Sequence, residues 1–112
     1  MGTVEELGPN TSGDWKKGDR VAGVVQGSNG LALEDGAFAE FAVMKAGTFF
    51  KVPENVKDEE AATVGVAFAT VGLGLYQTLS LPWPETVPAN CPLLIYGGSS
   101  ATGSVAIQFA KL

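Results

Sequence analysis

The chain has 112 residues, 46% of them hydrophobic, which suits one small globular domain and is unlike the composition of a disordered segment. Twelve acidic residues against seven basic ones give a net charge of −5, and this excess disfavours nucleic acid or an anionic membrane as a partner. We find no uninterrupted apolar run of about 20 residues and no basic, then apolar, N-terminal segment, so we expect neither a membrane span nor a secretory signal.

The first half of the chain has patterns typical of β-strands. Strands are predicted over residues 2–8, 21–25, 38–43 and 49–52, separated by segments rich in Gly, Ser, Asn and Pro. Over residues 38–43 the alternation places Phe38 and Glu40 on one face and Phe41 on the other.

The pattern becomes helical after Lys57. Asp58 is expected to cap the first helix, and a second, almost wholly apolar helix is predicted over residues 66–79. Glycine costs about 1 kcal/mol against alanine inside a helix, so Gly72 and Gly74 predict close backbone packing there. Residues 81–88 form a proline-rich connector and the best internal boundary.

A buried strand is predicted over residues 92–96, followed at once by a turn of small residues and a helix over residues 104–112. The turn consists of Gly97, Gly98, Ser99, Ser100, Ala101, Thr102 and Gly103. A strand, a turn of small residues and a helix are the context that a dinucleotide fingerprint requires, because the backbone must approach a pyrophosphate at a helix N-terminus.

The turn departs from that fingerprint at one position. From Gly98 the pattern is Gly-x-Ser-x-x-Gly, with Ser100 in place of the middle glycine. Its hydroxyl could donate to a phosphate oxygen, as could those of Ser99 and Thr102. The alternative is a flexible turn without a ligand. The residues do not match a P-loop, which needs Gly-Lys-Ser/Thr, or a nucleophile elbow, which needs Gly-x-Ser-x-Gly.

The histidine and cysteine counts restrict the chemistry. The chain has no histidine, which excludes a Ser-His-Asp triad and an ordinary catalytic zinc site built from these residues alone. Cys91 is the single cysteine, so no internal disulfide is expected, and it is interpreted as a small buried residue in a cytoplasmic protein. Any reaction must therefore use a cofactor or residues outside this segment.

Several segments, in order along the chain, resemble the medium-chain dehydrogenase/reductase superfamily. They are Gly2-Thr3-Val4, Gly18-Asp19-Arg20-Val21, Gly36-Ala37-Phe38-Ala39-Glu40-Phe41, Phe50-Lys51-Val52-Pro53, Glu59-Glu60-Ala61-Ala62, Leu94-Ile95-Tyr96-Gly97 and Ala106-Ile107-Gln108-Phe109-Ala110-Lys111. Superfamily members with a structural zinc lobe carry four cysteines soon after the Gly-Asp-Arg-Val turn, where this chain has none. The resemblance is therefore to the zinc-independent quinone oxidoreductase and trans-acting enoyl reductase branch.

This resemblance implies an α/β fold, in which a partial GroES-like β domain is followed by the first strand, turn and helix of a Rossmann domain. The corresponding expected boundaries are 1–56 for the β domain, 57–88 for a helical segment and connector, and 89–112 for the start of the NAD(P)-binding domain. It implies hydride transfer from NADPH to an activated C=C bond, without zinc. The substrate would be a small molecule or an enoyl group on an acyl carrier, with a polyketide synthase as a possible partner.

The residues carried over as cofactor contacts are those of the turn, 97–103, together with Thr70. Thr70 has the alternative role of a helix threonine that bonds to its own backbone. No catalytic acid is assigned: Tyr96 is expected in the core and Tyr76 between helices. The family's chain begins before Gly2 and continues beyond Leu112, so we expect a fragment that is inactive alone. The alternatives are a non-catalytic nucleotide-binding module and a degenerate remnant acting as an interaction surface.

Overall fold

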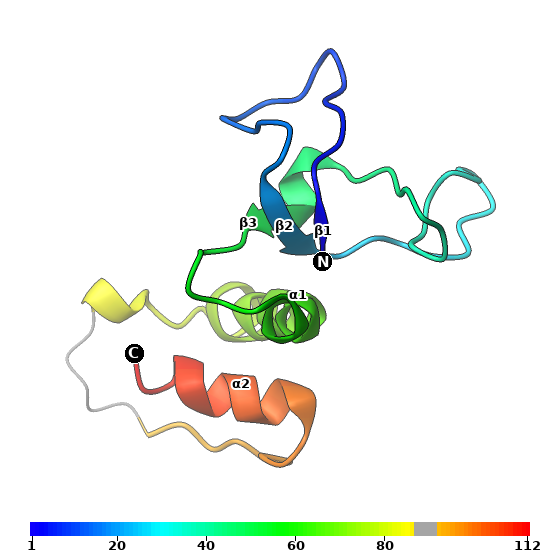
Figure 1. Cartoon of the computed structure of the whole chain (residues 1–112). Helices are drawn as coiled ribbons and strands as arrows, with labels where there is room; N and C mark the ends of the chain where they lie inside the picture. The colour runs from blue at the N-terminus through cyan, green and yellow to red at the C-terminus, as the bar shows by residue number, and fades with distance from the viewer. Residues whose placement is uncertain (87–91) are drawn as a thin grey trace. The chain divides into compact units, whose positions relative to one another are not determined.

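The computed structural model describes residues 1–86 and 92–112 and divides into two compact units, Met1–Gly65 and Val66–Leu112. The first unit contains a three-stranded sheet and the start of helix α1 (Asp58–Gly72), and the second contains the rest of α1 and helix α2 (Ala101–Phe109). Three antiparallel strands and two α-helices make the described chain a small α/β structure (Figure 1).

The sheet is antiparallel with the order β1-β2-β3. Its strands are β1 (Gly2–Thr3), β2 (Arg20–Gly23) and β3 (Phe49–Lys51), paired in the registers Gly2↔Val21 and Ala22↔Phe50. The core of this unit is small. It consists of Ala22, Val52 and Ala61, with Phe50 and Val56 packed against it.

Two of the four predicted strands are confirmed close to their expected limits, as β2 and β3. The strand predicted over residues 2–8 is shorter, because only β1 pairs with β2, although the Val4 amide still donates to the Asp19 carbonyl at 2.9 Å.

The strand predicted over residues 38–43 is wrong. That segment is a loop, in which Phe38 and Phe41 are exposed. Alternating polarity selects the faces of a strand but does not supply its partner, and the described chain offers no free strand that pairs with this segment.

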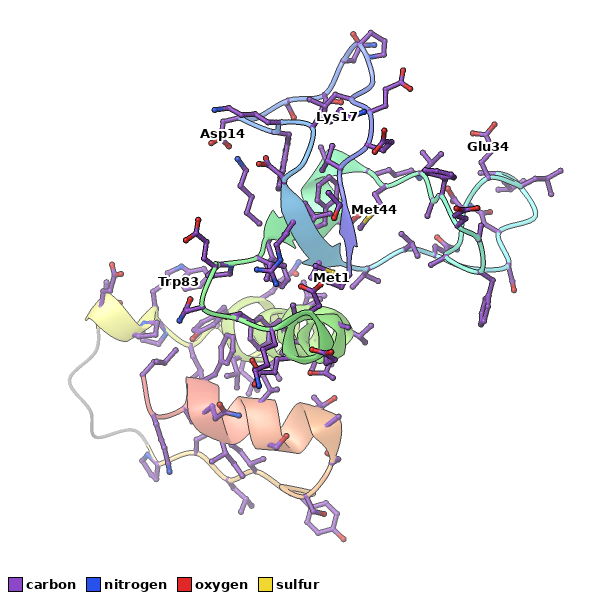
Figure 2. The ribbon with its side chains drawn as sticks, in the orientation of Figure 1. Met1, Asp14, Lys17, Glu34, Met44 and Trp83 are labelled. Atoms are coloured by element: carbon purple, nitrogen blue, oxygen red, sulfur yellow. The ribbon has the colours of Figure 1, made fainter. Side chains whose placement is uncertain are left out.

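A cluster of charges attaches the β1–β2 loop to β3. The Lys51 ammonium lies 3.0 Å from a carboxylate oxygen of Asp19 and 3.3 Å from one of Asp14, and 5.5 Å from the centre of the Trp15 ring. The hydrogen bond from Lys51 lowers the pKa of Asp19 below its ordinary value of 3.8, and Asp19 in turn raises the pKa of Lys51. Figure 2 shows Asp14 and Lys17 on this loop.

Arg20 connects the sheet to the beginning of α1. Its guanidinium donates to the Asp58 carboxylate, with Nε at 3.1 Å, and to the carbonyl oxygens of Pro53 and Val56 at 3.3 and 2.8 Å. The expected cap is displaced by one residue. The Lys57 carbonyl accepts from Ala61 and the Lys57 amide donates to the Glu60 carboxylate, so Lys57 occupies the cap position and Asp58 is the first helical residue.

One continuous helix replaces the two that were predicted. Helix α1 passes without interruption into a π-helical segment, η2 (Leu73–Thr78), in which the Leu79 amide donates to the Gly74 carbonyl. Ala67, Val71 and Leu75 form its buried stripe at intervals of four residues. The expectation that this apolar helix is packed on most sides is wrong, since Val66, Leu73 and Leu79 are exposed; they are apolar positions outside the stripe.

The prediction of close backbone packing at Gly72 and Gly74 is also wrong. A Cβ at either position would meet nothing within 4 Å. The close approach occurs instead at Gly65, where a Cβ would lie 2.7 Å from the Gly23 carbonyl oxygen of β2. A helix glycine thus serves packing in this chain, but at a different position from the expected ones.

Within the second unit α2 lies beside the C-terminal part of α1 (Figure 1), and the rings of Phe68 and Phe109 meet edge to face with centroids 5.4 Å apart. Tyr76, which was expected between helices, is half-buried and contacts another aromatic ring. Its ring stacks on Trp83, 4.3 Å away, just before the short helical turn η3 (Pro84–Thr86) of the connector.

The buried strand predicted over residues 92–96 is wrong. The segment forms no strand, and the residues Leu94 and Tyr96 are 93% and 101% exposed. A continuous apolar run becomes a buried strand only between neighbouring strands and helices, which the described residues of this unit do not provide. Tyr96 is therefore not a core residue here, and Cys91 lies outside the described residues.

The continuous helix Asp58–Thr78 has 21 residues, and an 18-residue stretch within it has a mean hydropathy of 1.2, so it is long and apolar enough to cross a membrane by these two measures. This differs from the expectation of no span, because the helix is longer than either of the two predicted helices. Core helices of soluble proteins meet the same criterion, so the measure by itself assigns no location.

Candidate functional site

The sequence-predicted turn leads into a helix, as expected, but α2 begins at Ala101, inside the segment predicted as turn, and ends at Phe109, whereas the helix was predicted over residues 104–112. Gly97 has a φ of +83°, in the left-handed region that side chains rarely adopt. The backbone then extends at Ser100, with φ −74° and ψ 161°, before α2 begins at Ala101. Because the position of the fingerprint's middle glycine is extended rather than left-handed, serine fits there without backbone strain.

Ser100 is the N-cap of α2. Its hydroxyl accepts a hydrogen bond from the Gly103 amide at 3.0 Å and donates one to the Gly97 carbonyl at 2.8 Å. The Ser100 amide donates to the same carbonyl at 3.0 Å. The serine that replaces the middle glycine therefore joins the turn to the first turn of the helix.

Gly103 is buried at the point where the helix touches the turn. A Cβ built there would lie 2.9 Å from both the Gly97 carbonyl carbon and the Gly98 Cα, and closer still to the Gly97 oxygen. At Gly98 a Cβ would meet the Ile107 side chain at 3.0 Å. The third glycine of the pattern is therefore required by the close contact between α2 and the turn.

Hydrogen-bond donors remain at the start of α2. The amides of Ala101 and Thr102 are the first two of the helix and have no acceptor within it, whereas the third, from Gly103, is taken by Ser100. The side chains of Ser99 and Thr102 are exposed and make no hydrogen bond to any described residue. The first turn of α2 contains no acidic residue, so nothing in it repels an anion.

The structure does not join Thr70 to this turn by any described hydrogen bond. Thr70 is exposed on α1, and its hydroxyl does not bond to its own helix, unlike that of Thr63, which donates to the Glu60 carbonyl at 2.8 Å. The role of a helix threonine that bonds to its own backbone is therefore not seen, and the role of a cofactor contact stays a prediction. No group of three or more metal-ligating side chains occurs among residues 1–86 and 92–112.

The capping role of Ser100 was missed by the sequence argument, which considered its hydroxyl only as a phosphate donor. The signal was present, because a serine directly before a helical run is a common N-cap. The usual acidic or amide partner three residues later is absent, since Gly103 stands there and supplies only its amide.

Comparison with known proteins finds trans-enoyl reductases that align with almost the whole chain. The chain is 49% identical over 123 residues to the trans-enoyl reductase resD of Aspergillus sclerotiorum and 51% identical over 112 residues to the trans-enoyl reductase TOXD of Cochliobolus carbonum. A trans-enoyl reductase of Gibberella fujikuroi is 42% identical over 114 residues. Each alignment covers 99% of this chain.

The chain is homologous to trans-enoyl reductases. It spans about a third of their length, since the alignments cover 34%, 38% and 32% of the three relatives. No protein-family profile matches the chain, and no solved structure matches it.

Proposed function

We propose that this chain contributes the start of the cofactor site to a trans-acting enoyl reductase that uses NADPH. The observation that carries the proposal is the 51% identity to a trans-enoyl reductase over 99% of the chain, which includes the whole turn from Gly97 to Gly103. The resemblance found in the sequence supports the same branch of the medium-chain reductases.

The residues of the turn fit a dinucleotide pyrophosphate. Gly97 and Gly98 carry no side chain that would keep a phosphate from the backbone, and the amides of Ala101 and Thr102 are unpaired at a helix N-terminus. When bound, NADPH supplies the hydride for one carbon of the C=C bond, and a proton completes the other. This chain's part is to hold and orient the phosphates, because we assign no proton donor among its residues.

The finer parts of the proposal follow the resemblance. We propose that residues 1–56 belong to a GroES-like β domain, 57–88 to a helical connector and 89–112 to the start of a Rossmann domain, in a zinc-independent cytoplasmic enzyme. The substrate is proposed to be an enoyl group carried by an acyl carrier, and the partner a polyketide synthase. Thr70 is kept as a proposed cofactor or substrate contact.

An exchange of segments tests the proposal. Residues 1–112 replace the aligned segment of the TOXD relative, and NADPH consumption is followed with a short enoyl thioester, with the unmodified relative as the reference. We expect NADPH-dependent reduction of the double bond by the exchanged protein. Folded protein that neither binds nor consumes NADPH would contradict the proposal, and NADPH binding without reduction would favour the non-catalytic nucleotide-binding module.

A further inference from the structure

We infer that Ser100 is a positioning residue of the cofactor turn and does not itself contact the phosphates. The inference rests on the proposed function, and it divides the turn's three hydroxyl side chains into two classes. Ser100 organises the turn, whereas Ser99 and Thr102 are available to the ligand.

The first step is the hydrogen-bonding capacity of Ser100. A hydroxyl has one proton, and that of Ser100 is donated to the Gly97 carbonyl at 2.8 Å while the oxygen accepts from Gly103 at 3.0 Å. A hydrogen bond from Ser100 to a phosphate would have to replace the one to Gly97. A phosphate that binds through other donors leaves both hydrogen bonds of Ser100 intact.

The second step is what those two bonds hold in place. They join the carbonyl of Gly97, whose φ is +83°, to the first turn of α2, at the contact where Gly103 has no room for a side chain. The bond that the Gly103 amide donates to Ser100 uses the third free amide of the helix and leaves those of Ala101 and Thr102 as donors. Ser100 thus determines which amides an incoming anion meets.

The third step concerns the remaining hydroxyls. Ser99 and Thr102 flank Ser100 within two residues, are exposed, and make no hydrogen bond to any described residue. Either can donate to a phosphate oxygen without breaking a bond inside the turn. They are the side chains whose loss should weaken binding while the turn stays intact.

The experiment uses the exchanged protein described above and measures two quantities in each variant, the NADPH dissociation constant and the hydrogen-exchange rate of the Gly103 amide. For Ser100→Ala we expect both to rise, by roughly three- to tenfold, as follows from losing an N-cap. Ser100→Thr, which keeps the hydroxyl, should restore both. Ser99→Ala and Thr102→Val should raise the dissociation constant and leave Gly103 exchange unchanged.

Weaker NADPH binding by Ser100→Ala with unchanged Gly103 exchange would make Ser100 a direct contact and overturn the inference. Faster Gly103 exchange with unchanged NADPH affinity would also overturn it, because the cap would then have no bearing on the cofactor. Absence of NADPH binding by the unsubstituted protein is a separate result, which counts against the proposed function.

Discussion

At the scale of single residues, two glycines that both lie in helices have very different surroundings. Gly103 is buried against the turn that precedes α2, and a Cβ there would lie 2.9 Å from backbone atoms of Gly97 and Gly98. Gly72 is helical, with φ −59° and ψ −47°, and a Cβ there would meet nothing within 4 Å. Gly103 is therefore required by packing, whereas Gly72 only weakens its helix.

These two positions form a matched pair for mutagenesis. Gly103→Ala should destabilise the exchanged protein by about 1–3 kcal/mol, because backbone must move to admit the methyl group. Gly72→Ala should stabilise it by about 0.5–1 kcal/mol, because alanine is the better helix former. Urea unfolding of both variants measures the two changes, and equal effects of the same sign would contradict the packing argument.

At the scale of elements, Arg20 connects β2, the loop after β3 and the start of α1 through its bonds to Asp58 and to the carbonyls of Pro53 and Val56. Its side chain is 33% exposed, compared with 70% for Lys17, which pairs with Glu5 in the β1–β2 loop. A partly shielded guanidinium with several acceptors contributes more than an exposed pair.

We therefore expect Arg20→Ala to lower the unfolding free energy by about 1–3 kcal/mol, since two carbonyl oxygens lose a charged donor. Lys17→Ala, the control, should change it by less than about 0.5 kcal/mol. Both are measured by denaturant unfolding of the exchanged protein. A larger loss for Lys17→Ala than for Arg20→Ala would refute the proposed connection.

The attachment of the β1–β2 loop to β3 should depend on pH in the acid range. The pKa of Asp19 is lowered in the folded chain by the hydrogen bond from Lys51. The contribution of Asp19 to the unfolding free energy is therefore present at pH values above its ordinary pKa of 3.8, and it is lost as the pH falls through the lower pKa of the folded chain. Asp19→Asn should remove that part of the acid dependence. Carboxyl carbon shifts of Asp19 measured by NMR during an acid titration check the direction, and a midpoint above 3.8 would disprove it.

At the scale of the whole molecule, the described chain buries few large side chains and exposes many. Its buried hydrophobic residues are Val21, Ala22, Val52, Ala61, Ala67, Val71 and Leu75, whereas Leu31, Leu33, Phe38, Leu94 and Tyr96 are largely or fully exposed. Small buried cores provide little stabilisation against the entropy of the ordered chain.

The 112-residue chain by itself should accordingly be marginally stable. We expect a broad thermal transition in circular dichroism, binding of a dye that senses exposed apolar surface, and no reduction of an enoyl thioester by NADPH. The exchanged protein is the control, since its added surroundings should sharpen the transition and reduce dye binding. A sharp cooperative transition of the 112-residue chain without dye binding would contradict the prediction, because it would show that the small core alone stabilises the fold.

The sequence by itself determined the local chemistry of this protein. Patterns of small residues and helix-forming residues placed the turn that begins at Gly97 and predicted a helix after it, although that helix starts three residues earlier than expected, because turn and helix preferences depend mainly on neighbouring residues. The ordered motifs also indicated the enoyl reductase relatives, since such motifs need no knowledge of packing.

Only the tertiary structure decided which apolar segments are covered and which hydroxyl is already bonded. Residues 38–43 and 92–96 have strand-like patterns but lack partners in the described chain, and a strand is stable only when its backbone groups and faces are satisfied by other segments. Ser100 likewise offers a donor in the sequence, yet the fold brings the Gly97 carbonyl and the Gly103 amide to it. The role of the Ser100 hydroxyl depends on its distances to these two backbone groups, which the sequence pattern does not specify.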